Sequence, residues 1–396
     1  MATLSFWEAR AAVLNRLKDA PLPPIETVQL AAADGRILAE TIRADRDLPP
    51  ADRSLRDGFA IRAADAPGEL TVVGEVRAGE PAIHAVGPGE AVEIMTGAPL
   101  PEGADAVVMV EHVTRAGNRI RVDRAVSPGE HRTPRGAEAR AGDALLEAGL
   151  RLGYCEVAVL ATVGRSEVRV YKKPRVAIVP TGDEVVELSD RPVDHQVRNS
   201  NAWSLAAQVR QAGGEPVPVG IARDNHASTR ELVERSLECD LVLLSGGVSA
   251  GKYDIVESVV ASLGAEFYFD RVLIQPGQPA VFGRVRNTYF FGLPGNPAST
   301  MVTFEIFARA ALERLAGLRE PRLPLTLARL SRPFRHKPGL TRFLPAVLAA
   351  NGLEVSPVEW KGSGDVPALA RANCYLVAQP DKEAWEAGEL ITVLLR

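Results

Sequence analysis

The stretch Leu241-Val242-Leu243-Leu244-Ser245-Gly246-Gly247-Val248-Ser249-Ala250-Gly251 is the most informative part of the sequence. Its four apolar residues predict a buried strand, and its glycines predict a tight turn before a helix over 255–263. Glycine lets the backbone turn its N–H groups toward an anion, and a helix N-terminus adds positive potential. The stretch therefore predicts a phosphate-binding loop, although a purely structural strand-to-helix turn explains the same glycines.

Strands and helices alternate on both sides of this stretch, between Tyr171 and Gly317. Strands are expected over 175–179, 217–221, 241–244 and 288–291, and helices over 201–212, 228–239, 255–263 and 298–315. Such alternation indicates a mostly parallel, doubly wound α/β sheet, and we assign it to residues 172–317. Ligands of these sheets lie outside the carboxyl ends of the strands, where the glycine-rich loop is expected.

The segments on either side of residues 172–317 show different patterns of predicted secondary structure. We expect an elongated, discontinuous domain from residues 1–44 and 141–171, which opens with a helix capped by Ser5 and Glu8. It continues with a strand over 26–30 and a short helix over 37–42. Short β-prone runs over 71–76, 91–95, 106–111 and 119–122 predict an inserted β-rich domain over 45–140. Residues 318–396 form a C-terminal β domain, in which Asn351-Gly352 predicts a hairpin.

Length, charge and composition restrict the function. A chain of 396 residues is long enough for several domains. A net charge of −4 and only 5% aromatic residues argue against a nucleic-acid partner. No apolar run is long enough to span a bilayer, and the first ten residues do not form a signal peptide. The three cysteines are far apart in the sequence and indicate a reducing compartment, so we expect a soluble, cytoplasmic protein without a membrane partner.

Three further stretches could carry chemistry. Pro180-Thr181-Gly182-Asp183-Glu184 ends the first strand of the α/β domain, and its paired carboxylates could face a cleft or a metal, or form a solvated turn. Leu293-Pro294-Gly295-Asn296-Pro297-Ala298-Ser299 joins a strand to a helix, where Ser299 could cap the helix or donate to an anion. Arg56-Asp57-Gly58-Phe59-Ala60, taken by itself, resembles a turn.

Together these motifs resemble the MoeA family of molybdopterin molybdenumtransferases, which includes the E domains of gephyrin and of its plant counterpart. The matching motifs are Arg56–Ala60, Ile94–Pro99, Pro180–Glu184, Ser245–Ser249 with Asp254, Gln275–Pro279 and Leu293–Pro297. The resemblance implies a MogA-like α/β domain, an elongated discontinuous domain, an inserted small β domain and a C-terminal β-barrel-like domain. It also implies a homodimer in which the inserted domain of one subunit faces the α/β domain of the other.

The resemblance further implies a reaction, in which molybdate is inserted into adenylylated molybdopterin with the help of Mg²⁺ and AMP is released. Its catalytic residues would be Asp57, Glu184, Asp224 and Asp254, of which the last three would hold the metal. The substrate and nucleotide would be bound by Thr96, Thr181, Gly182, Asp183, Ser245, Gly246, Gly247, Val248, Ser249, Arg271, Pro294, Gly295 and Asn296. Molybdate would be bound by Gln275, Gln278, Pro279, Ser299 and Ser363. Asp57 and Thr96 would reach this site from the partner subunit.

The sequence departs from the family at the molybdate site. Gln275 and Gln278 stand where the family usually has lysines, and Pro345 stands where an anion-binding arginine is often found. Two alternatives to the transferase therefore stay open. One is a paralogue that binds molybdopterin or nucleotide but inserts metal weakly, and the other is an interaction scaffold. Because a scaffold needs no clustered acids, the retained carboxylates favour the transferase.

Overall fold

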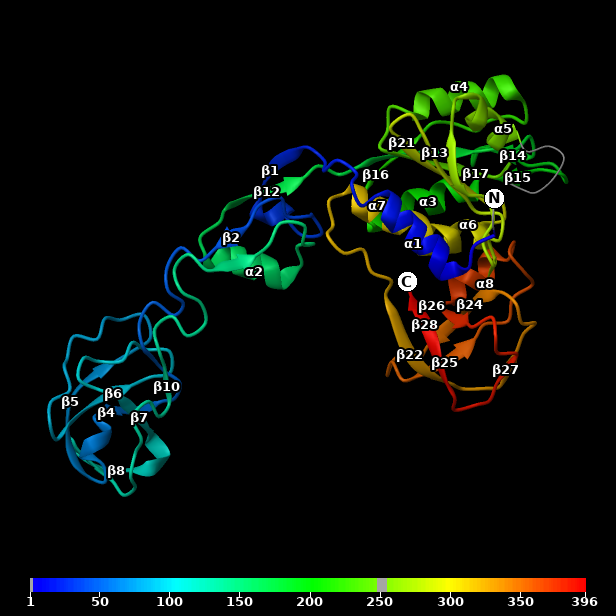
Figure 1. Cartoon of the computed structure of the whole chain (residues 1–396). Helices are drawn as coiled ribbons and strands as arrows, with labels where there is room; N and C mark the ends of the chain where they lie inside the picture. Colours follow the sequence, from blue (N-terminus) through cyan, green and yellow to red (C-terminus); the bar gives the residue numbers. More distant parts are fainter. Residues whose placement is uncertain (1–2, 248–254) are drawn as a thin grey trace.

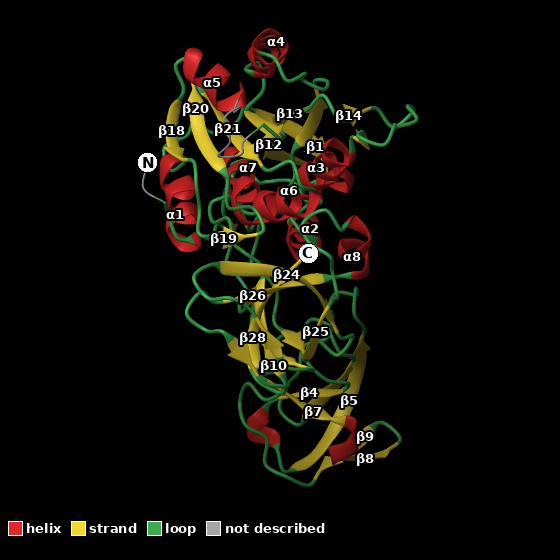
Figure 2. Ribbon diagram, turned by 90° about the vertical axis from the view of Figure 1, so that its right-hand side faces the viewer, coloured by secondary structure: helices red, strands yellow, loops and turns green. Residues whose placement is uncertain are grey.

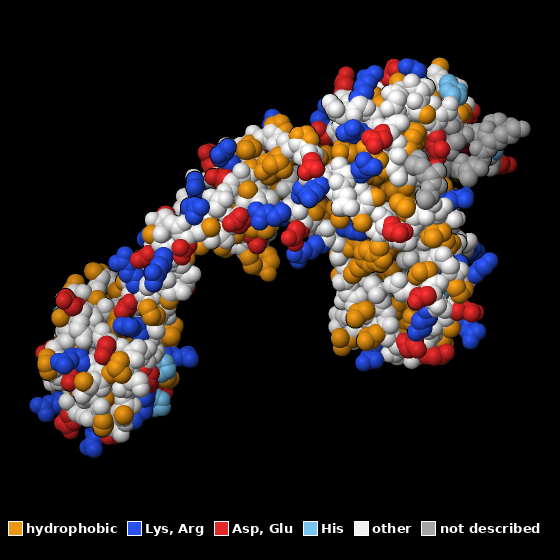
Figure 3. Space-filling view, viewed as in Figure 1, with side chains coloured by type: hydrophobic (Ala, Val, Ile, Leu, Met, Phe, Trp, Pro, Cys, Tyr) orange, Lys and Arg blue, Asp and Glu red, His pale blue; other side chains and the backbone are white. Residues whose placement is uncertain are grey.

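The protein is elongated and bent, and its two ends stand well apart (Figure 1). The computed structural model describes residues 3–247 and 255–396. Residues 45–140 lie at one end, residues 18–44 and 141–171 form a narrow connection, and the later residues form a larger body. On the face shown in Figure 3, basic and acidic side chains are interspersed over all of these parts. Among the described helices, none is both long and apolar enough to cross a bilayer.

A six-stranded sheet forms the centre of the larger body, in the order β16-β13-β17-β21-β20-β18. The first four strands are parallel, and β20 and β18 are antiparallel additions. The strands are β13 (Arg175–Pro180), β16 (Glu215–Pro218), β17 (Leu241–Ser245), β18 (Glu266–Phe269), β20 (Val281–Val285) and β21 (Thr288–Leu293). The expected mostly parallel sheet is confirmed, whereas the antiparallel pair was not predicted.

Helices cover both faces of this sheet (Figures 1 and 2). One face carries α4 (His226–Ser236) and α5 (Ile255–Ser262). The other carries α3 (Ser200–Gln211) and a continuous rod of α6 (Pro297–Thr303), a π-helix (Phe304–Ala308) and α7 (Arg309–Leu315). Neighbouring residues of the central strands alternate between two cores, because Leu243 packs into the α3 core and Val242 and Leu244 pack into the α4–α5 core. This alternation confirms the doubly wound arrangement.

The first helix, α1 (Phe6–Arg16), packs with the α/β body. The predicted cap is present, since the Ser5 hydroxyl accepts from the Glu8 N–H and the Glu8 carboxylate accepts from the Ser5 N–H. The buried face of α1 joins the same core as α3 and the π-helix, and the buried Arg10 donates to the Ile306 carbonyl oxygen at 2.8 Å. The apolar face of α1 is therefore buried against the helices that cover the sheet.

The narrow connection consists of short antiparallel ladders and one helix. Strand β1 (Ile25–Gln29) pairs with β12 (Glu167–Tyr171), and β2 (Ile42–Arg43) pairs with β11 (Ala144–Leu146). A 3₁₀ turn (Leu30–Ala32) and α2 (Tyr154–Thr162) pack beside them. The helix expected over 37–42 is absent. Ile37 and Leu38 form isolated β-bridges to residues 151 and 170 instead, because burial against these segments outweighs their local helical pattern.

The end of the molecule formed by residues 45–140 contains a second six-stranded sheet, here called the distal sheet. Its strand order is β7-β4-β6-β5-β9-β8. Its strands are β4 (Gly58–Ile61), β5 (Gly68–Val76), β6 (Glu90–Ile94), β7 (Ala106–Met109), β8 (Val113–Ala116) and β9 (Arg119–Val122), with β3 (Arg53–Ser54) pairing to β10 (Arg132–Thr133) and 3₁₀ turns at Ala63–Asp65 and Val110–His112. The motif at 56–60, which resembled a turn, instead enters strand β4 inside the sheet. Gly58 is required there, since a Cβ atom would lie 2.0 Å from the Val108 carbonyl oxygen.

A closed five-stranded barrel ends the chain. It runs β24-β25-β22-β28-β26 and closes where β24 pairs with β26. The barrel strands are β22 (Leu325–Leu330), β24 (Thr341–Leu348), β25 (Glu354–Pro357), β26 (Cys374–Ala378) and β28 (Leu390–Leu395), joined by β23 (Phe334–Arg335), β27 (Ala384–Trp385) and α8 (Val366–Arg371). The predicted hairpin at Asn351-Gly352 is confirmed between β24 and β25. Strand β19 (Ile274–Gln275) of the α/β body extends the barrel beside β24.

Candidate functional site

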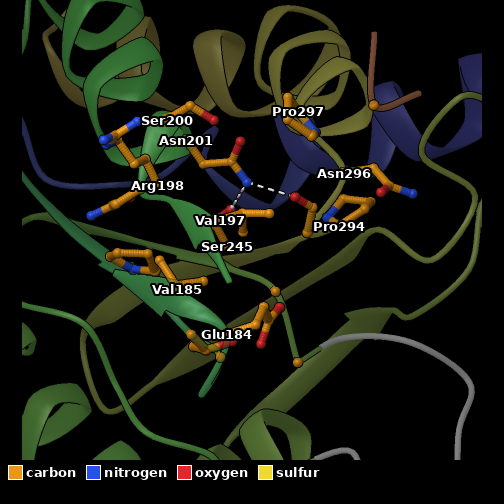
Figure 4. A pocket seen from close by; sticks show the side chains of 18 of the residues that line it. Glu184, Val185, Val197, Arg198, Ser200, Asn201, Ser245, Pro294, Asn296 and Pro297 are labelled. Atoms are coloured by element: carbon orange, nitrogen blue, oxygen red, sulfur yellow. Dashed lines mark hydrogen bonds between the residues drawn. The ribbon is translucent and has the colours of Figure 1, made fainter. Parts of the chain in front are cut away.

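An open pocket of about 990 Å³ lies at the carboxyl ends of β13, β17 and β21 (Figure 4). The loops after these strands line it, together with β14 (Val185–Val186), β15 (Val197–Arg198) and the start of α3. The predicted site residues that line it are Thr181, Gly182, Glu184, Asp224, Ser245, Gly246, Gly247, Pro279, Pro294, Gly295 and Asn296. Three separate motifs of the sequence therefore meet at one edge of the sheet.

Backbone hydrogen bonds hold the three strand-end loops side by side. The Thr181 N–H donates to the Ser245 carbonyl oxygen at 2.9 Å, and the Gly246 N–H donates to the Leu293 carbonyl oxygen at 3.0 Å. Gly246 has a φ of +102°, and a Cβ atom there would lie 2.8 Å from the Thr181 carbonyl oxygen. Only glycine allows the second loop to pass this close to the first.

The Asn201 side chain, which the sequence analysis did not single out, joins two of these loops. Its amide nitrogen donates to the Ser245 hydroxyl at 2.8 Å and to the Gly295 carbonyl oxygen at 2.7 Å. Because a carbonyl oxygen can only accept, the bond to Gly295 fixes the orientation of the amide. The Asn199 side chain caps the same helix by accepting from the Ala202 N–H. A sequence signal for this role exists in the polar run 198–201 at the predicted helix start.

Two of the predicted acids face the pocket. Glu184 and Asp224 both line it, whereas Asp183 is absent from the lining. The Asp183 N–H donates to the Asp224 carboxylate at 3.3 Å, and the Asp224 N–H donates to the Asp183 carboxylate at 3.1 Å. In this arrangement Asp183 positions the segment that carries Asp224.

The expected metal ligands are brought together only in part. Among residues 3–247 and 255–396, no group of three or more His, Cys, Asp or Glu side chains is arranged to hold a metal ion. The third expected ligand, Asp254, lies outside the described residues, as do Val248 and Ser249. Two carboxylates at one pocket nevertheless fit Mg²⁺, which commonly takes one or two carboxylates and completes its shell with substrate phosphates and water.

Arg198, also missed in the sequence, brings a positive charge to this pocket. It ends β15, which pairs in parallel with β14, so that Val186 stands opposite Arg198. The Val197 N–H donates to the Glu184 carbonyl oxygen, and the Asn199 N–H donates to the Val186 carbonyl oxygen, both at 2.9 Å. Glu184 and Arg198 are therefore held by one short ladder.

The residues expected to bind molybdate lie on segments that run from the pocket to the barrel. Pro279 lines the pocket, whereas Gln275 lies on β19 in register with Arg342 of β24. The Ala298 N–H donates to the Ser363 carbonyl oxygen at 2.9 Å, which brings the segment before α8 to the first turn of α6, where Ser299 is buried. The Gln278 carbonyl oxygen accepts from the Val272 N–H, and the exposed Arg271 accepts through its carbonyl oxygen from the Leu4 N–H.

The remaining predicted residues, Asp57 and Thr96, contact each other beside the distal sheet, just before β4 and just after β6. The Asp57 carboxylate accepts from the Thr96 N–H at 2.6 Å and from the Thr96 hydroxyl at 2.8 Å. These two bonds lower the pKa of Asp57 below its usual value, with the backbone N–H as the larger cause. Neither residue lines the pocket of its own chain.

Comparison with known proteins shows which family the chain belongs to. Models of the MoeA N-terminal region (domain I and II), a probable molybdopterin binding domain and the MoeA C-terminal region (domain IV) match residues 4–164, 177–314 and 327–395. A molybdopterin molybdenumtransferase of Staphylococcus aureus strain COL is 35% identical over 382 residues, which cover 94% of this chain and 91% of that protein. The chain belongs to the MoeA family.

Other MoeA relatives support the assignment. A molybdopterin molybdenumtransferase of a Nostoc species is 40% identical over 304 residues, covering 74% of this chain and 70% of that protein. A crystal structure of a molybdopterin biosynthesis MoeA protein from Pyrococcus horikoshii OT3 superposes with a TM-score of 0.82 at 30% identity, covering 100% of each chain. These matches confirm the family and the fold class that the sequence motifs indicated.

Proposed function

We propose that this MoeA protein is a transferase of molybdenum cofactor biosynthesis that inserts molybdate into adenylylated molybdopterin and releases AMP. The pocket at the carboxyl ends of β13, β17 and β21 carries the proposal. It combines the glycine loop after β17, which suits phosphate groups, with the carboxylates of Glu184 and Asp224. The names of the curated relatives agree with this reaction class.

Magnesium fits the acidic side of the pocket. Glu184 and Asp224 would hold the ion, with Asp254 as a third carboxylate. When bound, Mg²⁺ would neutralise negative charge on the phosphate bridge that is cleaved. The chain itself would keep the two loops that face this bridge in place through the Asn201 amide and the Thr181–Ser245 backbone bond.

Molybdate would bind beside this pocket, toward the barrel. Gln275, Gln278, Pro279, Ser299 and Ser363 belong to this proposed subsite. The two glutamines offer neutral amide donors where the family usually offers charged ones. Arg342 lies in register with Gln275 on the neighbouring strand β24. It is therefore a candidate for the positive charge that the two glutamines lack.

A two-fold dimer would complete the site. In one chain the distal sheet stands far from the pocket, with open space between it and the barrel (Figure 3). Asp57 and Thr96 are nevertheless ordered by their own hydrogen bonds and are well exposed. We place them over the pocket of the partner subunit.

The experiment that tests the function measures AMP release from adenylylated molybdopterin by the purified protein, with and without molybdate and Mg²⁺. We expect release to require both. If the protein bound adenylylated molybdopterin but released no AMP under any of these conditions, the binding paralogue would be the correct function. If it bound no adenylylated molybdopterin at all, both functions would be excluded.

A further inference from the structure

We propose that Arg198 binds a phosphate group of the nucleotide in the pocket. This inference rests on the proposed function, because it assigns a binding residue to the same pocket. Arg198 does not belong to any of the motifs by which the sequence resembles the MoeA family. The inference depends on the charges of the pocket, the anchoring of the side chain and the atoms that this anchoring leaves available.

The charges of the pocket require a cation for a phosphorylated ligand. Among the described residues that line it, Glu184 and Asp224 are the acids and Arg198 is the one Arg or Lys side chain. A phosphate entering a pocket that carries two carboxylates meets repulsion unless positive charge lies close to it. Metal bound by the carboxylates would compensate one part of the ligand, and Arg198 would compensate another from the β15 rim.

The backbone around Arg198 is held in place from both sides. Its neighbours Val197 and Asn199 donate to the carbonyl oxygens of Glu184 and Val186, so the β14–β15 ladder determines where the side chain starts. Immediately afterwards α3 begins, and Asn201 in its first turn is bonded to the Ser245 and Gly295 loops. Figure 4 shows Arg198 at the pocket with Val197, Ser200 and Asn201. A cation carried by such a segment is already positioned before a ligand arrives.

Among the described residues, the guanidinium group is anchored through one atom. Its Nε donates to the Asp190 carbonyl oxygen at 3.2 Å. With the described part of the chain, the two terminal nitrogens form no hydrogen bond or ion pair. Since the guanidinium is planar and its donors form a fixed fork, these nitrogens can bind two oxygens of one phosphate together. The Nε bond holds the fork without using the donors that a phosphate needs.

The competing explanation is that Arg198 only holds the loop 187–196 through Asp190. The two roles differ in what they predict for ligands with and without phosphate. We therefore propose titrating the full-length protein with AMP and with adenosine by calorimetry at fixed ionic strength. The variants are Arg198→Ala, Arg198→Lys and the control Arg191→Ala, which removes the same charge from the exposed part of the same loop.

We expect Arg198→Ala to weaken AMP binding by about 10-fold or more, as for loss of a charged hydrogen bond, and to leave adenosine binding unchanged. Arg198→Lys should retain part of the AMP affinity, since it keeps the charge but loses the fork. Arg191→Ala should bind both ligands as the natural protein does.

Two outcomes would overturn the inference in different ways. If Arg198→Ala weakened AMP and adenosine equally, or if Arg191→Ala matched its effect, Arg198 would act through the loop or through general charge, and the proposed function would be untouched. If the natural protein bound neither AMP nor adenosine, the result would contradict both the nucleotide pocket of the proposed function and the role of Arg198.

Discussion

Thr96 donates two hydrogen bonds to one oxygen of Asp57, at 2.6 Å from its backbone N–H and at 2.8 Å from its hydroxyl. Both bonds favour the ionised carboxylate, so the folded protein holds the pKa of Asp57 below its usual value. A lowered pKa stabilises the folded state above the unfolded-state pKa of this group. That contribution is lost as the pH falls through the lower, folded-state pKa.

The first prediction is that Thr96→Val raises the pKa of Asp57 only part of the way to its usual value. The substitution removes the hydroxyl donor but keeps the backbone N–H, which is the larger cause of the shift. A pH titration of the Asp57 carboxyl carbon by NMR measures the change, and Thr114→Val, on the exposed part of β8, serves as the control. An unchanged Asp57 titration would show that the hydroxyl does not stabilise the carboxylate in solution.

The second prediction concerns the shared site. Asp57→Ala and Glu184→Gln should each abolish most AMP release, because each removes a carboxylate from every site of a symmetric dimer. After subunit exchange between the two variants, hybrid dimers should regain activity, since one of their two sites has both residues intact. Tagged subunits would confirm that exchange took place. Confirmed hybrids without any recovered activity would mean that each site is built within one chain.

The third prediction is that the Glu184 carboxylate is needed for AMP release, whereas a neighbouring carboxylate outside the pocket is not. Glu184→Gln should reduce Mg²⁺-dependent AMP release by about 10²-fold or more, which is a common cost of losing a carboxylate that binds the metal or positions a reacting group. The control is Glu187→Gln, since Glu187 lies on the same exposed segment but outside the pocket lining. Near-normal turnover of Glu184→Gln, with its fold verified by circular dichroism, would contradict the assignment.

The fourth prediction concerns the two glutamines beside the barrel. Charged hydrogen bonds are worth roughly twice neutral ones, so Gln275→Lys with Gln278→Lys should strengthen molybdate binding by about 1–3 kcal/mol. Adenylylated molybdopterin should bind with little change, because Glu184, Asp224 and the glycine loop lie elsewhere. Molybdate titration at fixed ionic strength is the measurement.

The variant Arg342→Gln tests whether Arg342 contributes to molybdate binding in the same titration. If Arg342 supplies the positive charge that the glutamines lack, its loss should weaken molybdate binding in the natural protein and matter less in the double-lysine variant. Equal molybdate affinity of all these variants would show that the oxyanion is bound at other residues.

Local sequence patterns predicted the central part of the fold well. The run 241–244 is apolar throughout because both of its faces are buried, and that pattern predicted a buried strand. The alternation of strands and helices around it predicted the mostly parallel sheet. Glu8 and Ser5 likewise located the first helix, since a capping box depends only on nearby residues. Strand β4 was not predicted, because a four-residue segment that starts with glycine is too short to show a strand pattern in the sequence. Its position depends on pairing with β6 and β7.

The residues that line the candidate pocket could be predicted where they follow strand ends, and they were missed where they depend on distant contacts. Thr181, Glu184 and Gly246 belong to strand-end motifs, which a parallel sheet necessarily gathers at one edge. The role of Asn201 depends on its hydrogen bonds to Ser245 and Gly295, which lie 44 and 94 residues later in the chain. Arg198 follows a loop whose course cannot be derived from local preferences. No pattern within a few residues records such contacts.

The packing of α1 also has a consequence for synthesis of the chain on the ribosome. The apolar face of α1 is buried against residues near Phe307, about 300 positions later in the sequence. At roughly 5–20 residues per second, translation exposes this helix for about 15–60 s before its partner exists. A nascent chain stalled at residue 200 should therefore be cut by protease within residues 6–17, whereas the released full-length protein should be protected there.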